Sequence, residues 1–426
     1  MYVCRLDRPW LETDFMIQGF LIQSPEQIES LRQQCRYVFI DGSVNIKPKP
    51  QLNSQSVKQG NNKKQKLKSK RKSAADSCYA RPEQRVTYIN KISTEKEFVA
   101  AKETYAFAQT TAKDILNGIR IGRTIDLNQA KTTVNKVVDS ILRNKDALVC
   151  LTRLKNKDEY SAEHSLNVSI LATAFARHLG HGRSDLEEFA LCGLLHDVGK
   201  AKIPEHILTK NGRLSNEEVE LIKSHPTHGR NLLMSLPAGD LIAADVAHCH
   251  HERVDGMGYP RGLRDHQIPY IAKLISVVDC YDAITSNRCY DNARSSMEAL
   301  DIIYRCRDTQ IDRELAVEFI KCISIYAPGS IIELSDGSVG IILSTYADNR
   351  LKPKVLQVLN EKKLLSREKV IDLSMDLNDA SGHPLKIKRE IPNGAYGVEL
   401  RSYLEKGLLL GEHGSKTQSG NTGNPT

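Results

Sequence analysis

Histidine is concentrated in one part of this chain, in short motifs that also carry aspartate. Eleven of the 13 histidines lie between His164 and His266. Neutral imidazole is the commonest protein ligand for metals, and mixed imidazole and carboxylate sets favour hard or borderline divalent ions. This segment therefore predicts a multi-metal hydrolytic centre. Its four motifs are His196-Asp197-Val198-Gly199-Lys200, His225-Pro226, His250-His251-Glu252 with the loop that ends at Gly258-Tyr259-Pro260, and Asp279-Cys280-Tyr281-Asp282.

Seven side chains in this segment are our candidate metal ligands. Each lies on or at the end of a stretch whose apolar spacing predicts a helix, and a helical bundle can aim such side chains at one interior point. A single histidine is more often a core or surface residue than a ligand. Adjacent His-Asp and His-His pairs borne by apolar helices favour a shared site instead. The candidates are His164, His196, Asp197, His225, His250, His251 and Asp279.

The size of this ligand set predicts two divalent metal ions per chain, with Asp197 bridging them. Together the seven candidates fill most positions around two six-coordinate ions and leave room for phosphate oxygens. A metal pair of this kind activates water and stabilises the charge of an in-line phosphoryl displacement. The ten cysteines are scattered singly with no C-x-x-C pair, which argues against a closed structural zinc site.

The elements that must position these ligands are predicted to be mainly helical. Helical spacing dominates from Ser93 to about Cys322, and His225 is expected to end a helix that begins after the capping-box residue Ser215. Beyond this region, Pro328–Leu343 predicts a hairpin that turns at Asp336-Gly337, and Lys354–Leu359 predicts a further strand. A helical bundle followed by a short β-rich element is therefore expected.

The start of the chain predicts a small α+β domain interrupted by a basic linker. Strands are expected within Phe15–Ile22 and Tyr37–Asp41, around a helix over Pro25–Cys35. We assign residues 1–46 and about 80–140 to this N-terminal domain, with a disordered linker over 47–79. The metal-bearing domain then covers 141–325, the β-rich element 326–410, and a disordered tail 411–426.

The positive charge of the chain belongs to the linker. Ten Lys or Arg and no acidic residue lie between Lys47 and Lys72, which exceeds the net charge of +8, so the rest of the chain is slightly acidic. A solvated linker is the simpler interpretation, and a surface that binds polyanions is the alternative. No aromatic residue is interleaved for base stacking, so we expect no specific nucleic-acid partner. Unpaired cysteines and the absence of a signal peptide or long apolar run predict a cytoplasmic protein without a transmembrane segment.

Taken together, these motifs resemble the HD-GYP family of cyclic di-GMP phosphodiesterases, a branch of the HD phosphohydrolases. The resemblance covers roughly residues 140–325 and extends through Asp282-Ala283-x-Thr285-Ser286-x-Arg288-x-Tyr290. The opening segment, Leu6 to Trp10 and Cys35 to Val38, resembles an N-terminal domain of unassigned role that often precedes HD-GYP. The resemblance implies an HD-type helical bundle and hydrolysis of cyclic di-GMP to pGpG, with GMP as a further product, in bacterial signalling that controls biofilm and motility.

The same resemblance implies roles for individual residues. The seven candidate ligands would hold iron or manganese, and Asp197 and Lys200 would be the catalytic pair. Lys200 would meet the substrate phosphate, and Arg288 would grip it, because a guanidinium fork suits phosphate. Gly258, Tyr259, Pro260 and Asp282 would line the pocket. The same loop would contact diguanylate cyclase (GGDEF) partners, and a homodimer is one option for assembly.

Two departures from the family pattern keep alternatives open. Tyr160 stands where some members carry a Glu ligand for a third metal, so two metals are expected. Asp291 stands where a basic residue usually follows the Arg288 motif, which would weaken phosphate binding. We therefore weigh an active phosphodiesterase against a catalytically weak cyclic di-GMP receptor that acts through protein contacts, and against an HD phosphohydrolase for another nucleotide.

Overall fold

The computed structural model of this chain describes most of residues 85–405 and several short segments before them. The described residues are 2–6, 20–21, 25–34, 38–41, 82, 85–154, 160–210, 212–236, 240–286, 294–323, 325–346 and 349–405. They belong to two compact units, Met1–Arg71 and Lys72–Thr426. The predicted linker over 47–79, the predicted tail over 411–426 and Arg288 lie outside the described residues.

The first unit contains a three-stranded antiparallel sheet and one helix. Strand β1 (Tyr2–Leu6) lies between β2 (Phe20–Leu21) and β3 (Val38–Asp41). Helix α1 (Pro25–Gln34) connects β2 to β3 in the sequence and begins at Pro25 as predicted. The predicted α+β character is confirmed. Strand β1 was not predicted, because five residues that include Cys4 and Arg5 carry too little alternation to identify a strand.

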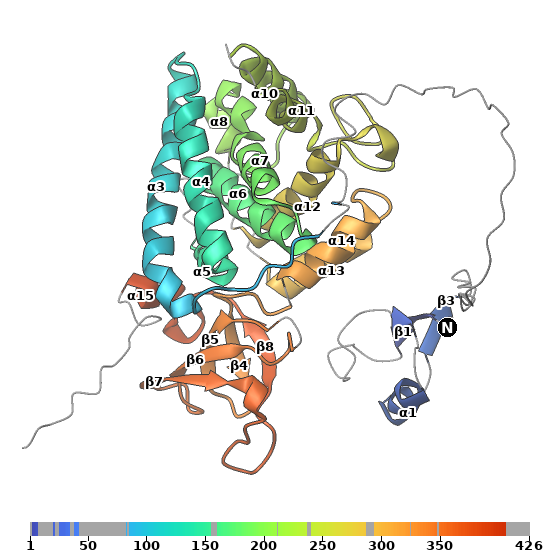
Figure 1. Cartoon of the computed structure of the whole chain (residues 1–426), viewed down its shortest axis with the longest axis vertical. Coiled ribbons are helices and arrows are strands. Elements are labelled where there is room, and N and C mark those ends of the chain that lie inside the picture. Colours follow the sequence, from blue (N-terminus) through green and yellow to red (C-terminus); the bar gives the residue numbers. More distant parts are fainter. Residues whose placement is uncertain are drawn as a thin grey trace, which may run out of the picture. The chain divides into compact units, whose positions relative to one another are not determined.

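The second unit is dominated by helices. The long helices α3 (Thr94–Arg120) and α4 (Leu127–Arg143) lie side by side, next to α6 (Tyr160–Leu179) and α7 (Arg183–Leu195) (Figure 1). Side chains such as Leu166 and Phe175 are completely buried, as expected of a helix at the centre of a bundle. The other helical elements are α5 (Lys145–Leu151), η2 (Val198–Lys202), α8 (Glu205–Leu208), α9 (Asn216–Lys223), α10 (His225–Met234), α11 (Leu241–Cys249), η3 (Asp265–Gln267), α12 (Tyr270–Thr285), α13 (Ser296–Cys306) and α14 (Arg313–Ile323).

The boundary between α9 and α10 corrects one prediction. The capping box of Ser215 and Glu218 is present and starts α9, as the sequence predicts. The helix ends before Ser224, however, and His225 begins α10 instead of ending α9. Pro226 is the physical reason, because its nitrogen cannot donate a hydrogen bond back into α9, whereas its fixed backbone angle suits the first turn of a new helix.

The C-terminal part is a five-stranded antiparallel sheet in the order β7-β6-β5-β4-β8. The predicted hairpin is confirmed as β4 and β5, and the predicted strand over Lys354–Leu359 is β6. The two edge strands were not predicted, because each carries charged residues at exposed positions and neither shows a clean alternation of apolar and polar residues. The elements are β4 (Ile331–Leu334), β5 (Val339–Ser344), β6 (Lys354–Leu359), β7 (Leu365–Asp372), η4 (Leu373–Met375), β8 (Ile387–Ile391), η5 (Ala395–Gly397) and α15 (Leu400–Glu405).

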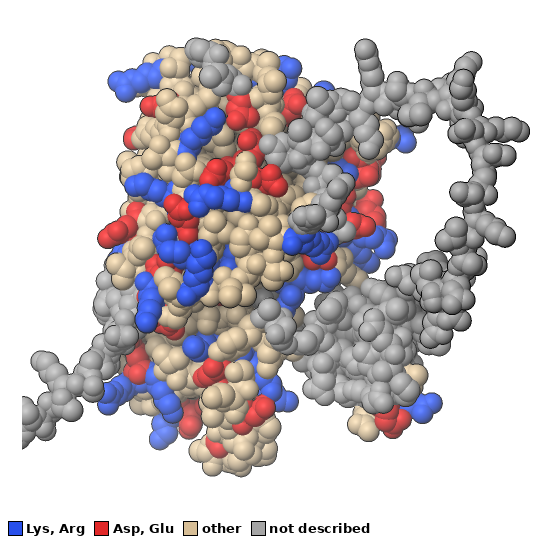
Figure 2. Space-filling model, in the orientation of Figure 1, with Lys and Arg blue, Asp and Glu red and all other residues tan. Residues whose placement is uncertain are grey.

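The surface of the second unit carries charges of both signs. Lys and Arg alternate with Asp and Glu over the described residues on the face drawn in Figure 2. This mixture agrees with the assignment of the net positive charge to the segment Lys47 to Lys72. Among the described segments, no helix combines the length and apolar character that crossing a membrane requires.

The sheet is joined to the helices by a partly buried polar junction. Arg153, which follows α5, donates hydrogen bonds to Tyr281 Oη at 3.2 Å, to Ser330 Oγ at 3.4 Å and to Ser296 Oγ. Glu390 on β8 accepts from Ser330 Oγ at 2.7 Å and from the backbone N–H of Ser296 at 3.0 Å. One arginine therefore links α12, α13 and the sheet.

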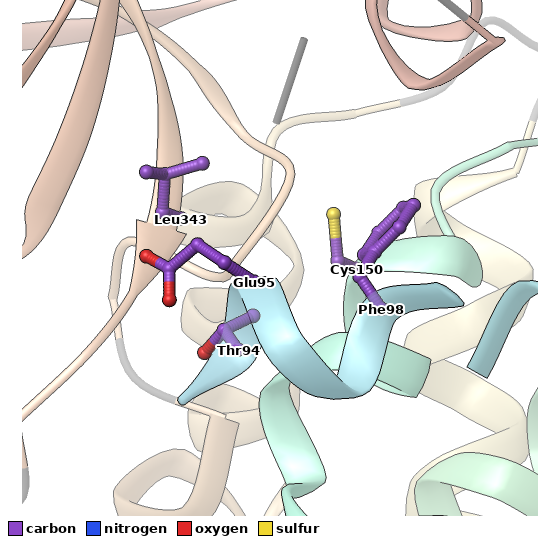
Figure 3. Close-up of a pocket in the computed structure, with 5 residues that line it drawn as sticks. All are labelled: Thr94, Glu95, Phe98, Cys150 and Leu343. Carbon is purple, nitrogen blue, oxygen red and sulfur yellow. The ribbon is translucent and has the colours of Figure 1, made fainter. Parts of the chain in front are cut away.

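Close backbone packing completes this junction. Gly329 has a positive φ of 85°, and a Cβ there would lie 3.1 Å from Cys150 Sγ and 3.2 Å from Arg153 Cγ. A small pocket lies where α3, α5 and β5 meet, and it is lined by Thr94, Glu95, Phe98, Cys150 and Leu343 (Figure 3). The sheet is therefore seated on the helical body and packs with it as one structure.

Replacing Arg153 with Met should destabilise the protein by about 3 kcal/mol. The hydroxyl groups of Tyr281, Ser296 and Ser330 would lose their hydrogen-bond donor, and Glu390 would lose a nearby cation. Denaturant unfolding measures this cost. The matched control is Arg313→Met, whose side chain is 64% exposed in its pair with Asp308, and it should cost less than about 1 kcal/mol. Equal losses of unfolding free energy in the two variants would contradict a stabilising junction at Arg153.

Candidate metal centre

All seven predicted ligands come together in the second unit, although five different helices or helix ends supply them. His164 lies on α6 and Asp279 on α12. His196 follows the last residue of α7, and Asp197 precedes η2. The last three are His225, the first residue of α10, and the adjacent His250 and His251, which follow α11. The helices thus point their ends or faces at one place in the bundle.

The seven side chains form two groups that share Asp197. One group consists of Asp197, His225, His250 and His251, and the other of His164, His196 and Asp279. Asp197 Oδ1 lies 3.2 Å from His225 Nε2 and 3.6 Å from His250 Nε2. Its other oxygen, Oδ2, lies 3.4 Å from His196 Nε2 and 3.6 Å from His164 Nε2. The carboxylate therefore presents one oxygen to each group, which is the arrangement expected of a bridging ligand.

Backbone carbonyls orient three of the imidazoles. The Nδ1 atoms of His196, His225 and His250 each lie within hydrogen-bond distance of the carbonyl oxygen three residues earlier, at 2.7, 2.6 and 3.0 Å. Those carbonyls belong to the last turns of α7, α9 and α11, where a helix leaves carbonyl groups without partners in its own backbone. Each Nδ1–H donates to its carbonyl, so each Nε2 faces the centre as an unprotonated ligand atom.

His164 is oriented by a carboxylate instead. Its Nδ1 lies 2.8 Å from Asp282 Oδ2, and its Nε2 lies 3.0 Å from Asp279 Oδ1. Asp282 is 1% exposed and is held behind the imidazole. Our sequence prediction assigned it to the substrate pocket, whereas this position fits a residue that orients a ligand. The spacing of Asp279 and Asp282 on one helix was the available signal, but it does not tell which of them faces the metal.

Burial tests whether these residues fit a metal. His196 is 0% and Asp197 2% exposed, and both His196 Nε2 and Asp197 Oδ1 are buried without a hydrogen-bond partner among the described residues. Buried polar atoms are rarely left without partners unless an ion or water completes them. The donor set of imidazole nitrogen and carboxylate oxygen suits a divalent cation. The residues therefore fit a metal site on geometry and on chemistry.

The protonation states agree with this conclusion. Burial would raise the pKa of the Asp197 carboxyl, but Lys200 and His196 hold it well below its usual value. Burial lowers the pKa of His196 to about 4 and that of His251 well below its usual value. His164 differs, because hydrogen bonds to Asp279 and Asp282 outweigh its burial and raise its pKa to about 9. Ionised carboxylates and mostly neutral imidazoles are the forms that bind metals.

The centre opens to solvent on one side. The side chains of His251 and Asp279 are 25% and 14% exposed, whereas those of His164, His196 and His250 are 1% exposed or less. Lys200 is predicted as a catalytic residue. Its side chain is 19% exposed, similar to those of His251 and Asp279, and it forms an ion pair with Asp197. An ammonium group there is close enough to the centre to meet an anionic substrate from the open side.

The predicted Gly258-Tyr259-Pro260 loop borders the same opening. The Tyr259 ring stacks on His251 with centroids 4.8 Å apart, and the Tyr259-Pro260 peptide bond is cis. Glu252, to which our sequence analysis gave no role, is 3% exposed and accepts the backbone N–H groups of Arg261 and Leu263 at 2.8 Å each. A carboxylate directly after a His-His pair and before a glycine-rich loop was the signal for this supporting role. Arg288 lies outside the described residues, so its predicted role is unchanged.

Gly199 makes the close packing of this centre possible, and Gly199→Ala should disrupt it. A Cβ at Gly199 would lie 1.9 Å from His225 O and 2.5 Å from Gly229 N, so α10 must move and carry His225 with it. We expect a loss of about 2 kcal/mol in stability and at least about 10-fold weaker Mn²⁺ binding. Calorimetric titration and denaturant unfolding measure both. Gly182→Ala is the control, because nothing lies within 4 Å of that Cβ; a similar loss of Mn²⁺ affinity there would contradict this role of Gly199.

Comparison with known families and proteins supports the same conclusion. Residues 140–315 match the HD domain, and residues 1–130 match a domain of unknown function, DUF3391. A cyclic di-GMP phosphodiesterase of Pseudomonas aeruginosa is 34% identical over 284 residues, which are 66% of this chain and 68% of that protein. A cyclic di-GMP phosphodiesterase of Thermotoga maritima is 35% identical over 39% of this chain and 45% of its own length. A 3'3'-cGAMP-specific phosphodiesterase of Vibrio cholerae is 35% identical over 34% of each chain.

The similarity to the Pseudomonas protein covers about two thirds of both chains. The HD match covers all seven ligand positions, and the DUF3391 match agrees with the resemblance of the opening segment. An HD domain together with the buried His and Asp cluster indicates a site for divalent metal. The chain therefore belongs to the HD-GYP family of phosphodiesterases, with an N-terminal DUF3391 domain.

Proposed function

We propose that this enzyme hydrolyses cyclic di-GMP to linear pGpG, with GMP as a further product, in bacterial second-messenger signalling that controls biofilm formation and motility. The position of Asp197 between two groups of imidazoles carries this proposal. Its two oxygens face different groups, at 3.2 to 3.6 Å from four Nε2 atoms. The names of the Pseudomonas and Thermotoga relatives support cyclic di-GMP as the substrate.

The proposed cofactor is a pair of divalent metal ions, iron or manganese. Asp197, His225, His250 and His251 would hold one ion, and His164, His196 and Asp279 the other. Mixed nitrogen and oxygen donors without thiolate suit both metals. When bound, such a pair supplies a water of lowered pKa and stabilises negative charge at phosphorus.

The chain itself supplies binding and orientation. Lys200, next to Asp197, would neutralise a non-bridging phosphate oxygen or the leaving oxygen as charge develops. Arg288 would hold the phosphodiester by paired hydrogen bonds. Gly258, Tyr259 and Pro260 would form the wall of the pocket, where Tyr259 also covers His251. Asp282 would keep His164 in the orientation that exposes Nε2.

The proposed setting is the cytoplasm. Six cysteines of the second unit, Cys150, Cys192, Cys249, Cys280, Cys306 and Cys322, are free thiols, as in proteins of reducing compartments. We propose the Gly258-Tyr259-Pro260 loop as the contact for diguanylate cyclase partners. Met257, which directly precedes this loop, is 80% exposed, and this supports an external contact there.

Anaerobic purification with metal analysis, followed by chromatography of products from cyclic di-GMP, tests the proposal. We expect about two iron or manganese ions per chain and formation of pGpG or GMP. Two metals with bound but unaltered cyclic di-GMP would instead identify a receptor, and Asp291 would then be the first residue to change to a basic one. Parallel incubation with 3'3'-cGAMP separates the two substrate classes named for the relatives.

Asp197→Ala should abolish metal loading and turnover together, because both groups of imidazoles lose their shared ligand. The expected loss of activity is at least about 10⁴-fold, since the chemistry depends on the metals. Metal analysis and product chromatography on the purified variant measure the two effects. A variant that retained both metals and normal turnover would refute the bridging role.

Lys200→Ala should keep the metals and lose rate. The side chain is partly exposed and contacts Asp197 without belonging to either ligand group. Loss of one charge-stabilising donor costs about 10²- to 10³-fold in kcat in comparable sites. Steady-state kinetics at saturating Mn²⁺ measures this loss, with Lys202→Ala, an exposed neighbour on η2, as the control. Loss of metal in Lys200→Ala would mean that the ion pair has a structural role.

A further inference from the structure

Helix α3 contacts the helix that carries His164 through one buried and one partly buried hydrogen bond. Tyr105 Oη donates to Asn167 Oδ1 at 3.2 Å, and Gln109 Nε2 donates to Glu163 Oε1 at 2.8 Å. Tyr105 is 6% exposed, Glu163 3% and Asn167 1%. The two acceptors lie on either side of His164 in the sequence of α6, and one of them is its direct neighbour.

The spacing of these four residues fixes how the helices sit against each other. Tyr105 and Gln109 are four residues apart on α3, and Glu163 and Asn167 are four residues apart on α6, so each pair occupies one face of its helix. These two hydrogen bonds restrain α6 from sliding along α3 and from rotating about its own axis. Apolar contacts alone would tolerate small shifts of this kind. Because a helix moves as a rigid body, a shift at Glu163 also displaces His164 Nε2.

The location of α3 connects this restraint to the N-terminal domain. The DUF3391 match covers residues 1–130 and therefore includes all of α3. The same helix also packs against η2, which carries Lys200. A segment of unassigned role thus contacts two of the elements that build the metal centre.

We propose that Tyr105 and Gln109 are positioning residues of the metal centre, through which the DUF3391 segment sets the affinity for metal and the rate of turnover. They touch neither metal nor substrate and act through Glu163 and Asn167 on His164. This inference rests on the proposed metal-dependent function, and its test therefore includes metal binding measured directly.

Exchanging the two partners provides the sharpest experiment. Gln109→Glu places a second carboxylate against buried Glu163, and we expect Mn²⁺ affinity and kcat to fall about 10-fold, with KM little changed. The double variant Gln109→Glu with Glu163→Gln restores a carboxylate–amide bond with the roles reversed, and it should recover most of both losses. Titration calorimetry of Mn²⁺ and steady-state kinetics supply the two readouts. Absence of recovery in the double variant would overturn the proposal.

A second variant covers the case in which Gln109→Glu fails to fold. Tyr105→Phe removes only the hydroxyl that bonds Asn167. Mn²⁺ affinity should fall about 3-fold, less than the roughly 10- to 100-fold typical of residues that bond a ligand directly, because Tyr105 acts through Asn167. The control is Ser140→Ala, which removes the 2.7 Å bond between α4 and Glu97 of α3 but leaves both hydrogen bonds from α3 to α6 in place. It should lower stability but leave Mn²⁺ affinity unchanged. Equal loss of affinity in Tyr105→Phe and Ser140→Ala, or no loss in Tyr105→Phe, would refute a specific positioning role.

These outcomes separate the inference from the proposed function. If the unmodified chain binds Mn²⁺ but hydrolyses no cyclic dinucleotide, the proposed reaction fails while the Mn²⁺ titrations still decide the role of α3. If hydrolysis is observed and the exchanged pair shows no effect on Mn²⁺ affinity, the reaction stands and the positioning role is refuted.

Discussion

The concentration of carboxylates and imidazoles at one buried point is the constraint on which the rest of this structure depends. Asp197 and Asp282 are almost completely buried, together with His164, His196, His225 and His250. Burying an ionised carboxylate is costly unless a cation or several donors compensate it. Lys200 supplies one positive charge at the edge of the cluster. Divalent cations would supply the remainder, so the protein core and the metal site are the same region.

The C-terminal ends of three helices orient the imidazoles of this cluster. The last turns of α7, α9 and α11 meet at this point, and their free carbonyls accept from the Nδ1 atoms of His196, His225 and His250. The C-terminal end of a helix carries partial negative charge, which favours a cation nearby. The helix ends thus have three effects. Their carbonyl groups gain hydrogen-bond donors, the tautomer of each imidazole is fixed, and a cation is favoured nearby. Pro226 contributes to this arrangement, because it has no N–H to donate to the carbonyl of Ile222, which accepts from His225 Nδ1 instead.

The domains around the centre act as restraints on its helices. Arg153 joins α12 and α13 to the C-terminal sheet, and Tyr281, one of its partners, lies between Asp279 and Asp282 on α12. N-terminal to the HD match, helix α3 contacts α6 beside His164. On the N-terminal side, residues beyond the HD match therefore hold a helix that carries a candidate ligand. On the C-terminal side, Ser330 lies beyond the match and contacts Arg153, which in turn contacts α12. The minimal motif set identifies the chemistry, but the geometry of the ligands depends on these neighbouring elements.

The sequence alone determined the class of fold, the family and the set of candidate metal ligands that the structure brings together. Adjacent His-Asp and His-His pairs on apolar helices put metal-binding groups where a purely structural core would carry apolar side chains. It also predicted the hairpin at Asp336-Gly337, where local turn chemistry is decisive. Tertiary structure decided what depends on contacts between distant segments: that Asp282 stands behind His164, that Glu252 supports the loop of Tyr259, and that Gln109 bonds Glu163. A carboxylate or amide at a given position can face solvent, metal or another side chain with equal local propensity. Only the packing of helices far apart in sequence determines which partner it meets.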